Sequence, residues 1–246
     1  MQFSNHPGYG AWRGSVFRAE TIRLVVQGIE ERGVLGKCDG VLSGYLGSLD
    51  TGQAVLDAVA RVKRANPAAR YCCDPVIGDI GRGVYVRSPI PEFIKQRLLP
   101  IADVVTPNQF ELDYLSGRGS ATMVELAAAI DALHECGPRV VFVTSLATDD
   151  TPDDAMDLVV SDGTDRCRLR TPRLPVVVNG AGDAIAALFF AHHLRTGSAA
   201  EAMSRAASSL FGVLRRTAEA GASEMLLVEA QEEFVKPSRV FAVERI

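Results

Sequence analysis

The chain has 246 residues, a formal net charge of −4 and a sequence pI near 5.6. One α/β domain over residues 1–246 can account for this length and bury a substantial core. Lysine and arginine are scattered rather than gathered into a stripe, which argues against a nucleic-acid partner. No apolar run approaches the roughly 20 residues that cross a bilayer, and the N-terminus lacks a secretion signal. We therefore expect a cytoplasmic protein without a membrane partner.

Cysteine and histidine form no pattern that is typical of a metal site. The five cysteines are odd in number and lack C-x-x-C spacing, so we expect reduced thiols in the core. His192 and His193 are neighbours on an expected helix and point about 100° apart. A zinc site is not expected.

Strands and helices are expected to alternate through the first 144 residues. A helix over residues 20–32 has Ile22, Val25, Val26 and Ile29 at helical spacing, which predicts one buried face. Further strands are expected within 39–47, 71–73, 104–105 and 140–144, with helices over about 50–66, 91–98, from Asn108 and over 122–136. This alternation predicts right-handed β-α-β units and a parallel sheet covered by helices.

The last hundred residues predict a different arrangement. Strands at 158–161 and 167–170 are joined by Asp162 and Gly163, a hairpin signal, so we expect an antiparallel edge. Helices follow at about 181–196 and 199–219, with a shorter one near 229–235. No repeat or linker divides the chain.

Open parallel sheets bind ligands at the carboxyl ends of their strands, where polar segments are expected here at 43–47, 74–79, 106–111 and 144–145. A fifth segment, Asn179 to Asp183, opens an almost wholly apolar helix. Its unpaired N–H groups and the helix dipole suit a transferring phosphoryl group, and Asp183 can accept a proton from an attacking alcohol. The alternative is a tight glycine turn in which Asp183 only stabilises the helix start.

Gly-Ala-Gly-Asp at 180–183, after Asp-Pro-Val-Ile-Gly-Asp at 74–79 and Thr-Pro-Asn-Gln-Phe-Glu at 106–111, resembles the pyridoxal kinases of the ribokinase-like superfamily. The similarity extends, in order and spacing, over essentially the whole chain. It implies a three-layer α/β/α fold with a mostly parallel central sheet. It also implies ATP-dependent phosphorylation of the 5′-hydroxymethyl group of pyridoxal to pyridoxal 5′-phosphate, a step of vitamin B6 salvage.

The resemblance assigns roles to individual residues. Asp183 takes the place of the catalytic base and contacts the substrate, and Gly180, Ala181 and Gly182 form the anion hole around the γ-phosphoryl. Family members usually have threonine at the position of Ala181, but backbone amides make the hole. The implied nucleotide contacts are Asp74, Thr106, Glu111, Thr144, Pro172, Arg173, Leu174 and Pro175. Thr144 could equally only end a strand.

ATP and Mg²⁺ are the co-substrate and cofactor that the resemblance implies, and a K⁺ requirement is a further expectation. The implied metal-site residues are Asp74, Asp79, Asn108 and Glu111. Asp74 and Asp79 could instead belong to a turn around Pro75. Asn108 and Glu111 also have the spacing of a helix cap and its partner, and both roles are compatible.

The implied substrate contacts are Phe3, His6, Pro7, Gly8 and Tyr45, besides Asp183. Phe3, His6 and Tyr45 would surround the pyridine ring, although Phe3 could equally be a core residue. Pro7 stands where family members commonly have a substrate-contacting threonine.

Family members begin about 40 residues earlier, and losing their first strand, with a serine, a glycine-rich loop and a helix, would expose sheet edges and apolar surface. The chain is therefore expected to be an N-terminally incomplete pyridoxal kinase domain. The alternatives are a hydroxymethylpyrimidine-type kinase on the same fold and a non-catalytic protein that binds nucleotide or pyridoxal. A homodimer is expected from the resemblance.

Overall fold

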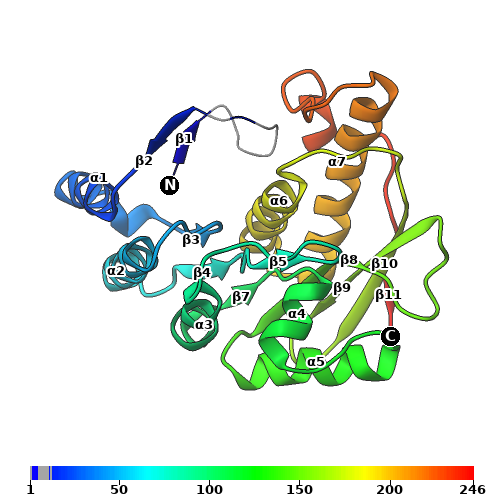
Figure 1. Ribbon diagram of the computed structural model, residues 1–246, viewed down its shortest axis with the longest axis horizontal. Coiled ribbons are helices and arrows are strands. Elements are labelled where there is room, and N and C mark those ends of the chain that lie inside the picture. The colour runs from blue at the N-terminus through cyan, green and yellow to red at the C-terminus, as the bar shows by residue number, and fades with distance from the viewer. Residues whose placement is uncertain (1, 5–10, 12) are drawn as a thin grey trace. The chain divides into compact units, whose positions relative to one another are not determined.

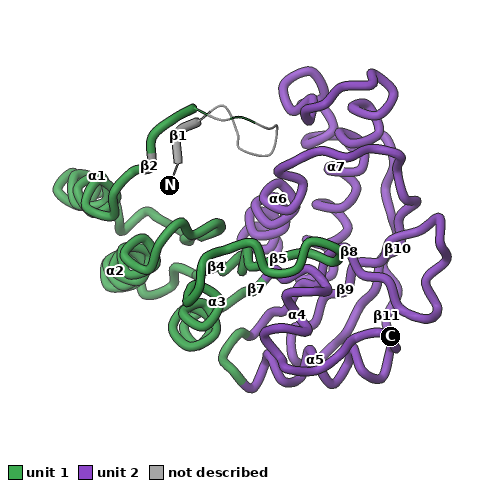
Figure 2. Tube along the Cα trace, in the orientation of Figure 1, with its two compact units in different colours: residues 1–105, 136–138 green, residues 106–135, 139–246 purple. Residues whose placement is uncertain are grey.

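The computed structural model describes residues 2–4, 11 and 13–246, with the backbone alone for residues 2–4 and 16. The chain forms two compact units, which Figure 2 distinguishes by colour. Unit 1 comprises residues 1–105 and 136–138, and unit 2 comprises residues 106–135 and 139–246. None of the described helices is long and apolar enough to cross a membrane.

Unit 1 contains a parallel ladder of β3 (Gly40–Ser43), β4 (Arg70–Cys73) and β7 (Val104–Val105). Cys72 is opposite Leu42 on one side and Val104 on the other. The side chains of Tyr71, Cys72 and Val104 are completely buried, as expected for strands covered on both faces. The predicted parallel strands are thereby confirmed.

Helices connect these strands (Figure 1). α2 (Leu49–Ala65) begins at Ser48, whose hydroxyl accepts the N–H of Thr51, and it buries Val59 and Val62. The second connection is made by α3 (Ile90–Phe93), a π-helical turn η3 (Ile94–Leu98) and a 3₁₀ turn η4 (Leu99–Ile101). A short 3₁₀ turn, η2 (Leu35–Lys37), precedes β3.

The prediction of one buried face on α1 (Ala19–Glu31) is wrong. Val25 is 58% exposed and Ile29 is 40% exposed, and Ala19 is the one residue of this helix that is buried. α1 is joined to α2 through polar pairs, with Arg23 bound to Asp57 and Glu30 to Arg61. Helical spacing of apolar residues sets a face, but burial needs a packing partner along that face.

Two antiparallel hairpins complete unit 1. β1 (Gln2–Ser4) pairs with β2 (Gly14–Val16), and β5 (Gly78–Asp79) pairs with β6 (Gly83–Val84). Gly81 in the turn of the second hairpin has φ +86°, and Gly83, the first residue of β6, has φ +67°. The segment between β4 and α3, for which the sequence predicted neither a helix nor a strand, thus has regular structure.

Unit 2 contains an antiparallel ladder in the order β8 (Val140–Leu146), β9 (Ala155–Ser161), β10 (Arg166–Pro172) and β11 (Glu244–Arg245). The expected hairpin is confirmed, because Asp162 accepts the N–H groups of Thr164 and Asp165 and Gly163 has φ +85°. β11 was not predicted, since two charged residues give no strand pattern. The sheet of the protein is mixed, and the α/β fold class is confirmed.

The helices of unit 2 lie on both faces of its strands (Figure 1). α4 (Gln109–Ser116) and α5 (Met123–Glu135) lie on one face, and α6 (Ala181–Thr196) and α7 (Ala199–Glu219) lie on the other. Phe189 of α6 stacks on Phe142 of β8 with ring centroids 4.2 Å apart. A 3₁₀ turn, η5 (Gln231–Phe234), stands where a short helix was expected.

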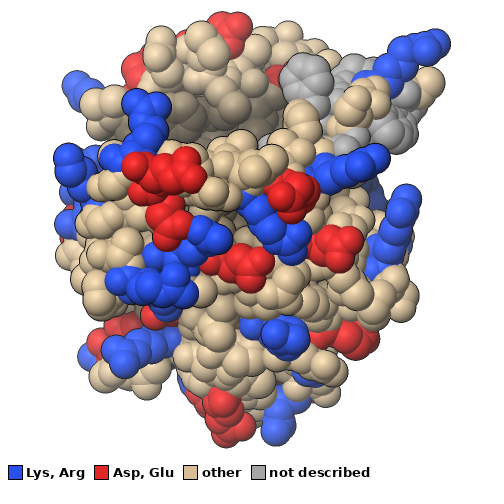
Figure 3. Space-filling model, turned by 90° about the vertical axis from the view of Figure 1, so that its left-hand side faces the viewer, with Lys and Arg blue, Asp and Glu red and all other residues tan. Residues whose placement is uncertain are grey.

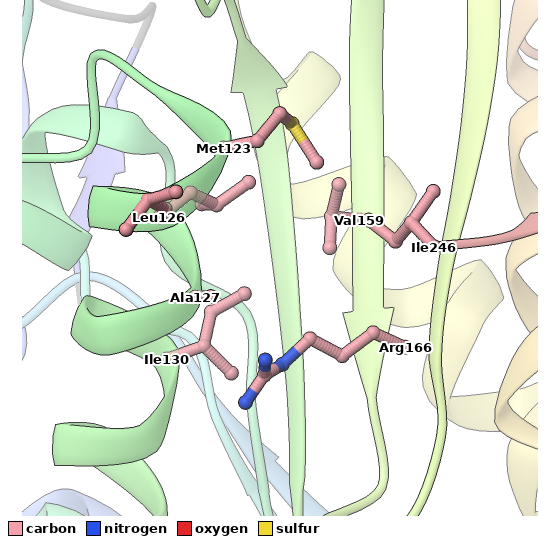
Figure 4. A pocket seen from close by; sticks show the side chains of 8 residues that line it. Met123, Leu126, Ala127, Ile130, Val159, Arg166 and Ile246 are labelled. Carbon is pink, nitrogen blue, oxygen red and sulfur yellow. The ribbon is translucent and has the colours of Figure 1, made fainter.

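A pocket of about 390 Å³ lies between α5 and the neighbouring strands of unit 2 (Figure 4). Its lining is almost wholly apolar and comprises Met123, Val124, Leu126, Ala127, Ile130, Val159, Arg166 and Ile246. None of these is a predicted site residue.

The expectation of thiols in the core is confirmed for Cys72 and Cys73, which are buried, but Cys38, Cys136 and Cys167 are only partly buried. All five cysteines are free. On the face drawn in Figure 3, acidic and basic side chains are intermixed rather than gathered into a patch of one sign.

Candidate active site

The start of α6 has the geometry that an anion site requires. Gly180 is the N-cap residue, with φ +84°, and its carbonyl accepts the N–H of Ala184 at 2.9 Å. Any other residue would be strained in this left-handed conformation. Ala181, Gly182 and Asp183 form the first turn, whose N–H groups have no partner within the helix. The turn can therefore present backbone donors to a phosphoryl group.

The carboxylate of Asp183 stands beside this turn. One of its oxygens, Oδ2, lies 3.9 Å from the point that a Cβ on Gly180 would occupy, and Asp183 is exposed. The helix behind it is held by Ile185, Ala186 and Phe189, which are buried. The helix thus holds a carboxylate next to backbone N–H groups that can bind a phosphate.

The start of α4 is a complete capping box. Asn108 Oδ1 accepts the N–H of Glu111, and Glu111 Oε2 accepts the N–H of Asn108, both at 2.9 Å. Glu111 is only 4% exposed. The capping role of this pair is confirmed, and its role toward a metal stays a prediction.

The predicted nucleotide contacts Thr106 and Thr144 are both buried, and Thr144 lies next to the start of α4. Thr144 donates its N–H to the carbonyl of Pro107 at 2.9 Å and forms a parallel bridge with Asn108. The next residue, Ser145, has φ +52°, at the place where the β8–β9 register shifts. The end of β8 therefore bends, and Ser145 is exposed there.

Gln109 is a structural residue of this site that the sequence did not reveal. It is buried, and its side-chain N–H groups donate to the carbonyls of Ser120 at 3.1 Å and Ala147 at 3.0 Å. Its carbonyl accepts the N–H of Ala147 at 3.1 Å. One amide thus ties the start of α4 to the loop after β8. No local pattern distinguishes such a glutamine from an exposed one at a helix start.

The predicted segment from Pro172 to Pro175 begins at the last residue of β10 and continues into the loop that follows it. Arg173 donates its N–H to the carbonyl of Asp154 at 2.7 Å, and Val176 donates to the carbonyl of Leu174 at 2.9 Å. Pro172, Arg173 and Pro175 are exposed. The segment is held at its backbone, with its side chains open to solvent.

In unit 1, Asp74 follows β4 directly and is buried, and its N–H donates to the carbonyl of Ser43 at 2.9 Å. Burial, together with the charge of Asp74, raises the pKa of the Cys72 thiol, so that thiol stays neutral. Asp79 is exposed in β5, and its Oδ1 accepts the N–H of Ile80 at 2.7 Å. Tyr45 lies in the loop between β3 and α2 and is half exposed.

The predicted substrate contacts near the N-terminus cannot be placed in the site. His6, Pro7 and Gly8 lie outside the described residues, and Phe3 is described only as backbone of β1. Their contact with a pyridine ring stays a prediction.

The family model described as "Phosphomethylpyrimidine kinase" matches residues 16–227. Among curated proteins, the pyridoxal kinase PdxY of Granulibacter bethesdensis is 53% identical over 98% of this chain and 86% of its own length. That of Deinococcus radiodurans is 49% identical over 100% of this chain and 85% of its own length. This chain belongs to the pyridoxal kinase PdxY family.

Solved structures support the family at the level of the fold. The pyridoxal kinase of Leishmania donovani in complex with ADP and pyridoxamine matches 98% of this chain and 86% of its own, with 26% identity and a TM-score of 0.88. The pyridoxal kinase of Entamoeba histolytica gives a TM-score of 0.86 at 25% identity, over 100% of this chain and 86% of its own. The resemblance inferred from the motifs is thereby confirmed.

The Mg²⁺ that the family implies needs oxygen ligands from the protein. Within the described part of the chain, no three His, Cys, Asp or Glu side chains form a group that could hold a metal ion. Mg²⁺ in phosphoryl-transfer sites needs only one or two carboxylates, because phosphate oxygens and water supply the rest. Asp74 and Glu111 each fit that requirement as single carboxylates.

Proposed function

We propose that this protein transfers the γ-phosphoryl group of ATP to the 5′-hydroxyl of pyridoxal, giving ADP and pyridoxal 5′-phosphate. The observation that carries the proposal is the exposed carboxylate of Asp183 beside the glycine turn that opens α6, in a chain of the pyridoxal kinase family. Backbone N–H groups of Gly180, Ala181 and Gly182 would receive the charge on the transferring group. Asp183 would accept the proton of the attacking hydroxyl.

The backbone supports this division of roles. An anion hole built from N–H groups does not depend on the side chain at position 181, so Ala181 can replace the usual threonine. Thr106, Thr144 and residues 172–175 are the proposed nucleotide contacts, and Tyr45 with Phe3, His6, Pro7 and Gly8 are the proposed pyridoxal contacts. The solved relatives that bind ADP with pyridoxamine or pyridoxine support both ligand classes.

Mg²⁺ belongs to the same proposal. Bound with ATP, it would neutralise charge on the phosphates. The proposed residues for holding it are Asp74 and Glu111, with Asp79 and Asn108 nearby in sequence. A K⁺ requirement is proposed as well. Turnover assays in which each cation is omitted in turn test both ions.

The decisive variant is Asp183→Asn, which removes the proton acceptor and keeps the shape of the side chain. We expect kcat to fall by roughly 10² to 10⁴-fold, with little change in ATP affinity. The measurement is the rate of pyridoxal 5′-phosphate formation, with nucleotide binding measured by calorimetry. Glu201→Gln is the matched control, because Glu201 is an exposed acidic residue in the first turn of α7. Near-normal turnover of Asp183→Asn would refute the assignment.

The same assay tests the two alternatives, a hydroxymethylpyrimidine-type kinase and a non-catalytic binding protein. Hydroxymethylpyrimidine offered in place of pyridoxal should give a much lower kcat/KM if the proposal holds. A non-catalytic binder would form no ADP with either compound.

A homodimer is also proposed from the family resemblance, and its mass in solution can be measured by light scattering.

A further inference from the structure

A second part of unit 2 packs against the glycine turn of α6, and it comes from the C-terminal region. The segment of residues 222–230 is fixed at both ends to α7. At one end, Thr217 of α7 accepts the N–H of Ala222 on its carbonyl at 3.1 Å and the N–H of Leu226 on its hydroxyl at 3.2 Å. That hydroxyl donates in turn to the carbonyl of Val213 at 2.8 Å, and Thr217 is completely buried.

The other end of this segment is anchored by buried groups. Ala230 is completely buried and donates its N–H to the carbonyl of Leu226 at 2.9 Å. Glu233, only 1% exposed, accepts the N–H of Ser238 at 2.7 Å and lies 3.5 Å from the guanidinium of Arg216 on α7. The segment is therefore a fixed arm rather than a loose tail.

Met225 is the residue by which this arm reaches the candidate active site. Its Cε lies 3.4 Å from the point that a Cβ on Gly180 would occupy. Leaving aside its chain neighbours Asn179 and Ala181, the described side chains with an atom within 4 Å of that point are those of Met225 and Asp183. A glycine has the widest backbone freedom of any residue, so packing must restrict it if its turn is to hold one shape.

We propose that Met225 is a positioning residue of the phosphoryl site. Held in place by Thr217, its side chain covers one side of the Gly180 turn and keeps the N–H groups of residues 180–182 directed at the γ-phosphoryl group. The inference rests on the proposed function of that turn as the anion hole. Met225 touches the turn rather than the reacting atoms, and its effect passes through the backbone of Gly180.

The test compares binding of AMP-PNP and ADP, each with Mg²⁺, by calorimetry. Because the two ligands differ by the γ-phosphoryl group, their affinity ratio reports on the anion hole without any need for pyridoxal. We expect Met225→Ala to lower AMP-PNP affinity about 10-fold and kcat with pyridoxal by a similar factor, while ADP affinity and the KM for pyridoxal stay within about twofold.

Four further variants make the result specific. Met225→Leu keeps an apolar side chain of similar volume and should retain wild-type values. Thr217→Val removes both hydroxyl hydrogen bonds at nearly constant shape and should reproduce the loss, whereas Thr217→Ser should not. Val228→Ala, on the same arm at a 73% exposed position, is the control expected to change neither ratio nor rate.

Two outcomes would overturn the inference. An equal loss of ADP and AMP-PNP affinity in Met225→Ala would place the side chain at the nucleoside rather than at the phosphoryl turn. Wild-type affinity for both ligands would remove its positioning role. Failure of the proposed function is distinct, because wild-type protein would then make no pyridoxal 5′-phosphate whatever the binding ratio of the variants. Thermal unfolding of each variant separates these effects from loss of the fold.

Discussion

Buried polar side chains fix the loops around the candidate active site one residue at a time. Gln109 holds the backbone of Ala147, Thr217 that of Leu226 and Glu233 that of Ser238. The motifs revealed Asp183, Asn108 and Glu111, because glycine turns and capping boxes are local patterns. Gln109 and Met225 could not be found that way, since their partners are 38 and 45 residues distant and no local signal marks such contacts.

Gln109→Leu should destabilise the protein clearly. The change would leave the N–H of Ala147 and the carbonyls of Ser120 and Ala147 without their amide partner. An unsatisfied buried group costs about 1–3 kcal/mol, so we expect the free energy of unfolding to fall by at least about 2 kcal/mol. Denaturant titration measures it. Gln27→Leu is the control, because Gln27 makes only an exposed contact with Glu31 and should change stability by less than about 0.5 kcal/mol.

At the scale of elements, apolar periodicity predicted most helices and strands of both units, because each pattern reports on one element. It could not predict the exposed face of α1, the hairpin of β5 and β6 or the strand β11. These depend on which neighbours an element meets. Glu244 of β11, for example, pairs with β10 through its backbone and binds Arg168 of that strand through its side chain. Packing contacts likewise decide whether replacing a helical glycine by alanine stabilises or destabilises the protein.

Two glycines inside helices should respond to alanine with opposite signs. A Cβ on Gly212 of α7 would lie 2.1 Å from Glu233 Oε2, so Gly212→Ala must displace a buried carboxylate and should cost about 2 kcal/mol or more. A Cβ on Gly28 of α1 meets no atom of the other described residues within 4 Å, and Gly28→Ala should stabilise the protein by about 0.5–1 kcal/mol. Melting temperatures that shift in the same direction would contradict this reading.

At the scale of the whole chain, the path between the units is the feature to test. The chain leaves unit 1 after Val105, returns to it for residues 136–138 and leaves again. The returning stretch is closely packed, because a Cβ on Gly137 would lie 2.8 Å from the carbonyl oxygen of Pro100, and Gly137 has φ +141°.

Gly137→Ala should therefore cost about 3 kcal/mol or more, since it adds a backbone clash to backbone strain. Gly163→Ala is the matched control: Gly163 has φ +85°, but a Cβ there meets nothing within 4 Å, so only about 1–2 kcal/mol of strain is expected. Chemical denaturation of both variants gives the comparison. Equal losses would show that the contact with Pro100 contributes nothing.

The return of residues 136–138 also limits how this gene can be divided. A split after Val105 would give a first fragment that lacks the backbone packed against Pro100, and a second fragment that carries it without its partner. Expression of the protein as two fragments would therefore have to supply residues 136–138 together with the first fragment. Recombination that exchanged one unit without the other would face the same constraint, because residues 136–138 belong to unit 1 but lie within the sequence of unit 2.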